Sequence, residues 1–124
     1  MERAQYEAII RDTIEALPDQ IREKLNDVAI VIEETAPPQK RGILLGLYEG
    51  MPLTEWGRDM VAKLPDKITL FTASIEQVAG SEERIPDIVR ETLWHEIAHY
   101  FGFGHDRIHV MEERWRAKRG LQEQ

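Results

Sequence analysis

The spacing of apolar residues divides the chain into helical segments and short strand-like runs. Tyr6, Ile10 and Leu17 fall on one helical face together with apolar residues between them, a spacing typical of an amphipathic helix. Residues 28–32 form instead a short, apolar and largely β-branched run, which is typical of a buried strand. Along the chain, the pattern predicts helices over 6–17 and 18–26, strands over 28–32, 43–48 and 67–72, a short helix with Ser74 at its start and Gly80 at its end, a long helix over 83–101 and a last helix over 106–118.

The predicted helix over 83–101 is the longest element of the chain. Its sole proline, Pro86, falls in the first turn, where a missing N–H is tolerated, and Gly102 is placed to stop the helix. At about 100° per residue, one arc of this helix carries Ile88, Thr92, His95 and His99. Only a narrow strip is predicted to be exposed, formed by Asp87, Glu91 and Ala98. We therefore expect a helix that is enclosed on most sides.

No internal repeat or low-complexity tract appears along the chain. The length of 124 residues lies in the usual range for one domain. We therefore expect residues 1–124 to form a single domain with one hydrophobic core.

The composition narrows the classes of partner and cofactor. The chain has no cysteine, which excludes disulfides, iron–sulfur clusters and thiolate zinc sites, so any metal must be held by histidine and carboxylate. Its 23 acidic and 16 basic residues give a net charge of −7, which disfavours a nucleic-acid partner because basic groups bind a phosphate backbone. No apolar run is long enough for a membrane-spanning helix, and the first residues do not resemble a secretory signal. We expect a cytoplasmic protein that binds neither membrane nor nucleic acid; the sequence leaves its oligomeric state open.

Three histidines between positions 95 and 105 form the most informative pattern. His95 and His99 differ by about 40° around a helix and by about 6 Å along it, so both imidazoles can reach one metal ion. His105 would lie about 15 Å along an uninterrupted helix, so the chain must turn back before it, and Gly102 and Gly104 make that return possible. The sequence predicts a Zn²⁺ ion held by His95, His99 and His105, with a fourth position open for water as in catalytic zinc sites.

Glu96 follows His95 directly and projects about 100° around the helix, beside the metal rather than onto it. Zinc lowers the pKa of its bound water toward about 7, so a carboxylate beside it can take the proton and later pass it to a leaving amine. We interpret Glu96 as the general base of a zinc metallopeptidase that hydrolyses peptide bonds. The expected partner is a peptide or protein substrate.

The metzincins, a branch of the zincin metallopeptidases, carry the signature His-Glu-x-x-His-x-x-Gly-x-x-His. Residues 95–105 resemble it without a gap, with the sequence His-Glu-Ile-Ala-His-Tyr-Phe-Gly-Phe-Gly-His. More broadly, the chain resembles a family of small bacterial zinc metallopeptidases with a minimal zincin fold, in which the strands over 44–48 and 68–71 have counterparts. This resemblance implies an α+β fold, with a small mixed sheet of about three strands packed against a long active-site helix and flanking helices. It also implies that His95, His99 and His105 are ligands and that Glu96 is the general base.

The resemblance implies further parts of an active site. In zincins an edge strand above the metal pairs with extended substrate, and residues 67–72 are the expected strand. Metzincins have a methionine turn beneath the metal, but Met111 aligns with Trp115 one helical turn on, which favours core packing instead. The candidates to stabilise an oxyanion are Tyr48, Tyr100, Arg107 and His109. Core packing is the alternative role for the tyrosines, and a solvated helix face is the alternative for the other two.

Two other functions stay open. A non-catalytic module would keep the zinc site for stability or for binding a partner, which the small size and the lack of a specificity subdomain favour. A zinc endoribonuclease of ribosomal RNA maturation places three histidines at the same spacing, but that family has glycine where this chain has Glu96, and the net charge of −7 opposes RNA binding.

Overall fold

The computed structural model describes residues 1–50 and 66–102. Within these ranges, every helix and strand that the hydrophobic pattern predicts is present, with different ends. The elements are α1 (Arg3–Glu15), α2 (Asp19–Lys24), the 3-10 turn η1 (Leu25–Asp27), β1 (Val28–Glu33), β2 (Gly46–Glu49), β3 (Asp66–Phe71), α3 (Thr72–Ala79), the 3-10 turn η3 (Glu82–Arg84) and α4 (Ile85–Tyr100). The helix predicted over 106–118 lies outside the described residues.

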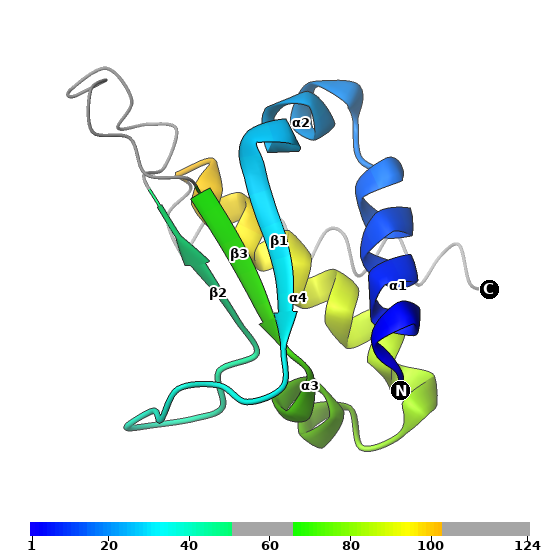
Figure 1. The fold of residues 1–124 in the computed structure, drawn as a ribbon, viewed down its shortest axis with the longest axis vertical. Helices are drawn as coiled ribbons and strands as arrows, with labels where there is room; N and C mark the ends of the chain where they lie inside the picture. The colour runs from blue at the N-terminus through cyan, green and yellow to red at the C-terminus, as the bar shows by residue number, and fades with distance from the viewer. Residues whose placement is uncertain (51–65, 103–124) are drawn as a thin grey trace.

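The three strands form one mixed sheet in the order β1-β3-β2 (Figure 1). β3 runs parallel to β1, with Ile30 opposite Ile68, and antiparallel to β2, with Tyr48 opposite Ile68. The mixed sheet of three strands confirms the α+β prediction. The prediction of an edge strand over 67–72 is wrong, because β3 is hydrogen-bonded on both sides. β1 and β2 are the edge strands of the described sheet.

Helix α4 runs across one face of the sheet, and α1 packs against α4 (Figure 1). The core lies between these elements and includes five buried residues of α4: Ile85, Val89, Leu93, Ile97 and Tyr100. The Tyr100 hydroxyl donates a hydrogen bond of 3.1 Å to the carbonyl oxygen of Lys24, which ties the end of α4 to the end of α2. Burial, and then the nearby carboxylates of Asp66 and Asp27, raise the pKa of Tyr100 above its ordinary value. Its hydroxyl therefore stays neutral in the core.

Three local predictions differ from the structure. Ala98 was expected on an exposed strip but is 1% exposed. A helical wheel gives the direction in which a side chain points, but it does not show which other element packs against that side of the helix. β2 begins at Gly46 rather than at residue 43, since the bond from the Phe71 N–H to the Leu45 carbonyl at 3.0 Å is the last between the two strands. Helix α3 begins at Thr72 without a side-chain cap, and the Glu34 carbonyl accepts from the Ala73 N–H at 3.0 Å instead.

Gly46 allows β2 to lie close to α4. A Cβ atom at this position would meet Thr92 Cγ2 of α4 at 2.8 Å and the Thr69 carbonyl oxygen of β3 at 3.2 Å. A side chain at position 46 would therefore push the edge strand away from the helix. The absence of a side chain places β2 directly beside the face of α4 that carries the histidines.

Candidate metal centre

His95 and His99 lie in the last two turns of α4 and bring their imidazoles together. Their Nε2 atoms are 3.0 Å apart, and the rings meet edge to face with centroids 4.7 Å apart. Two nitrogens that each lie about 2.1 Å from one tetrahedral zinc ion are about 3.4 Å apart, so the observed separation is close to that required. The i, i+4 spacing therefore gives the convergent pair that the sequence predicts, and the donors fit a zinc ion.

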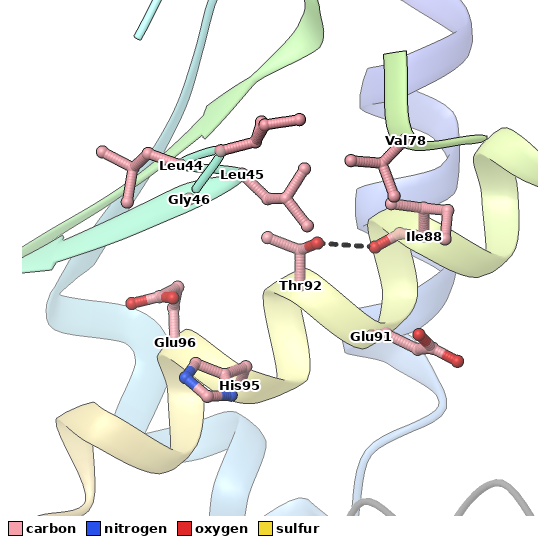
Figure 2. Close-up of a pocket in the computed structure, with 10 residues that line it drawn as sticks. Leu44, Leu45, Gly46, Val78, Ile88, Glu91, Thr92, His95 and Glu96 are labelled. Carbon is pink, nitrogen blue, oxygen red and sulfur yellow. Dashed lines mark hydrogen bonds between the residues drawn. The ribbon is translucent and has the colours of Figure 1, made fainter. Parts of the chain in front are cut away.

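Glu96 completes a compact group with the two histidines. One ligand atom from each of His95, Glu96 and His99 lies within 4.8 Å of the others, an arrangement that could hold a metal ion. Glu96 is 8% exposed, whereas both histidines are half-buried. In Figure 2 the Glu96 carboxylate extends from α4 into the space below Leu44 and Gly46, and His95 lies beside it on the helix. The three residues form the arrangement of a His-Glu-x-x-His motif.

Helix α4 ends just after this group. The Phe101 N–H still bonds to the Ile97 carbonyl at 3.1 Å, and the Gly102 N–H bonds to the His99 carbonyl at 2.9 Å. Gly102 has φ of 82°, in the left-handed region that glycine adopts without strain. The predicted end of the helix at Gly102 is thus confirmed. His105 and Gly104 lie outside the described residues, so the third ligand stays a prediction.

A pocket of about 340 Å³ begins at His95 and Glu96 and continues along α4. The segment before β2, the end of α3 and the first half of α4 also line it, with Ile43, Leu44, Leu45, Gly46, Val78, Ile88, Glu91 and Thr92. The helical wheel had placed Ile88 and Thr92 on the arc of the two histidines. It could not show Val78 or residues 43–46, because they come from other elements.

The structure assigns other roles to two candidate oxyanion donors. The Tyr48 hydroxyl donates to Asp66 Oδ1 at 2.9 Å, and Asp66 is fully buried. The Tyr100 hydroxyl is engaged with the carbonyl of Lys24. Both tyrosines serve the packing of the core, which was the alternative to an oxyanion role. The other candidates, Arg107 and His109, lie outside the described residues, as does Met111.

A helix that carries a His-Glu-x-x-His group beneath a small mixed sheet defines a zincin-like architecture. The sequence model of the zincin-like metallopeptidase family matches residues 25–115, more than half of the chain. This chain belongs to the zincin-like metallopeptidase family, as the resemblance implied.

A solved structure has a fold similar to that of this chain. The structure, a conserved hypothetical protein from Thermo thermophilus, is similar with a TM-score of 0.59 and 23% identity over 82% of this chain and 94% of that chain. This likeness concerns the fold. No curated protein matches the sequence. Among the described residues, no helix is long and apolar enough to cross a membrane.

Proposed function

We propose that this protein is a zinc-dependent metallopeptidase in which His95, His99 and His105 hold the ion and Glu96 is the general base. The observation that carries the proposal is the convergence of two imidazoles and a buried carboxylate, of which His95 and Glu96 line one end of a pocket. The family supports a peptidase, and the absence of cysteine leaves histidine nitrogens as the natural ligands.

The three residues of the described group have different chemical tasks. A zinc ion at this site would supply a water molecule whose pKa is lowered toward about 7 and would polarise the carbonyl of the substrate. Glu96 would take a proton on a carboxylate oxygen and later give it to the departing amine nitrogen. His95 and His99 act as neutral donors through Nε2, which leaves the full charge of the ion for activation.

Burial of Glu96 suits this task. At 8% exposure, its carboxylate has little competing contact with bulk water, and its position on α4 is fixed by the packed helix. The proton acceptor is therefore held ready, so its orientation need not be established during the reaction.

The edge strand β2 is the part of the sheet that suits an extended substrate. Residues 43–46 border the pocket that contains His95 and Glu96, whereas β3 is enclosed by its neighbours. A peptide that pairs with the outer side of β2 would run past the two reactive side chains. This assignment replaces the strand over 67–72.

The substitution Glu96→Gln tests the proposal, because it keeps the size of the side chain and removes its basicity. We expect zinc binding to be retained and kcat for peptide hydrolysis to fall about 100- to 10,000-fold. The matched control is Glu83→Gln, which removes the same charge from the exposed turn η3 and should leave kcat unchanged. Zinc content is measured by metal analysis and hydrolysis with a broad peptide library.

Two results would contradict the proposal. One is a Glu96→Gln protein that hydrolyses peptides at the wild-type rate. The other is a zinc-loaded wild-type protein that hydrolyses no peptide in the library, which would favour a non-catalytic zinc module.

A further inference from the structure

The pocket beside His95 and Glu96 is apolar over most of its wall. Five of its lining residues carry aliphatic side chains: Ile43, Leu44, Leu45, Val78 and Ile88. Figure 2 shows Val78 on α3 and Ile88 on α4 side by side at the end away from Glu96. The pocket thus leads from the reactive groups to an aliphatic end.

The exposed apolar residues of the described chain gather at this pocket. Ile43 is 47% exposed and Val78 is 38% exposed, and they are the large hydrophobic residues that the described part of the chain leaves exposed. A single exposed aliphatic residue is ordinary on a protein surface. Two of them on the wall of the pocket that begins at His95 and Glu96 indicate a surface that an apolar ligand covers.

The polar groups of the pocket wall affect which charge a ligand side chain can carry. The Thr92 hydroxyl donates to the Ile88 carbonyl at 2.7 Å, so its proton is committed within the helix. The charged side chains on the wall are the carboxylates Glu91 and Glu96, and no lysine or arginine is among the described lining residues. An acidic ligand side chain would therefore lose its hydration against a mostly aliphatic wall that supplies no described lysine or arginine in return.

The volume of the pocket limits the size of the ligand. At about 340 Å³ it lies at the small end of the range for ligand sites, which begins at about 300 Å³. It can hold one large side chain with the adjoining backbone and not a folded surface.

We infer that this pocket is a substrate subsite that selects an aliphatic or aromatic side chain close to the hydrolysed bond and rejects an acidic one. The inference rests on the proposed peptidase function and adds the class of substrate. Residues 43–45, Val78 and Ile88 determine the selection, and they do so through contact with the substrate side chain.

The test compares two lysine substitutions on neighbouring residues of α3. Val78→Lys places a cation on the pocket wall, whereas Gln77→Lys places the same cation on an exposed residue that does not line the pocket. Specificity constants are measured for a peptide series in which one position next to the cleaved bond is Leu, Phe, Ala or Asp. Zinc content and thermal melting are recorded for each protein.

Wild-type protein should cleave the Leu and Phe peptides with kcat/KM about tenfold or more above the Ala peptide, and the Asp peptide least. Val78→Lys should lose about tenfold of the preference for Leu over Ala and gain cleavage of the Asp peptide, with unchanged zinc content. Gln77→Lys should retain the wild-type profile. Equal cleavage of the Leu, Ala and Asp peptides by the wild type would overturn the subsite and leave the peptidase function intact.

A second measurement keeps the two proposals separate. Zinc-loaded Glu96→Gln protein is titrated with the same peptides, and binding is followed by the NMR signals of the Ile43 and Val78 methyl groups. Tighter binding of the Leu than of the Ala peptide, with shifts at these methyls, supports the subsite even where the wild type cleaves nothing. Equal affinity for both peptides overturns it.

Discussion

The two faces of α4 show how one helix supports both the fold and the chemistry. On the inner face, Val89, Leu93 and Tyr100 are fully buried at 0% exposure. On the other face, His95 and His99 are half-buried and converge at 3.0 Å. The inner face fixes the helix against the sheet and α1, so the histidines are held in place without contributing to the core. The difference predicts that stability and metal binding can be removed separately.

Truncation of the inner face should have the largest effect. Leu93→Ala removes a fully buried side chain and should lower the free energy of unfolding by about 2–5 kcal/mol. Denaturant unfolding measures this loss. Ile88→Ala, on the half-buried face of the same helix, is the control and should cost less, because part of the side chain is already in contact with water. Equal losses at the two positions would abolish the distinction between the faces.

Truncation of the histidine face should leave the core intact. His99→Ala should weaken zinc binding more than about 100-fold. Loss of a residue that only hydrogen-bonds to a metal ligand already costs about 10- to 100-fold in metal affinity, and loss of the ligand itself should cost more. The stability of the metal-free protein should change by no more than about 0.5 kcal/mol. Isothermal titration with zinc and denaturant unfolding in chelator measure the two quantities. Unchanged zinc affinity would remove His99 from the metal centre.

Removal of zinc by a chelator should lower the melting temperature but leave a folded protein. Binding to the folded state alone stabilises it by about 2.7 kcal/mol at a free zinc concentration 100 times the Kd. The core residues of α4, β3 and α1 pack without using the histidines, so the metal-free protein should keep its circular dichroism. If chelation instead unfolds the domain, zinc is a structural ion, and the non-catalytic module becomes the better interpretation.

The part of the site that lies on one helix could be predicted from the sequence. The i, i+4 spacing fixes the relative direction of His95 and His99, and Glu96 follows from the same geometry. Gly102 ends the helix because its backbone adopts φ of 82°. These features depend on contacts between residues close in the chain, which local patterns encode.

The features that depend on distant segments could not be predicted in this way. Residues 67–72 form a good strand by pattern, but only the pairing of β1 and β2 with it shows that the strand is central. Val78 carries no sign in the sequence that it lies against Ile88 in the pocket. Ala98 was misplaced for the same reason, since burial depends on what packs against a helix face. Pairing and packing across elements are therefore what the structure adds.

Gly46 allows β2 to pack against the face of α4 that carries the histidines. A double substitution tests how closely the strand and the helix pack. The Cβ of Gly46→Ala would lie 2.8 Å from Thr92 Cγ2, so this variant should lose about 1–3 kcal/mol of stability through overpacking. Thr92→Ser removes that methyl group and keeps the hydroxyl that bonds to the Ile88 carbonyl. The double variant should therefore recover part of the loss, and a double-mutant cycle by denaturant unfolding measures the coupling. Strictly additive losses would mean that Thr92 does not limit the approach of β2 to α4, and that contacts within the sheet, with Leu70 Cδ2 and the Thr69 carbonyl oxygen each 3.2 Å from the added atom, cause the loss instead.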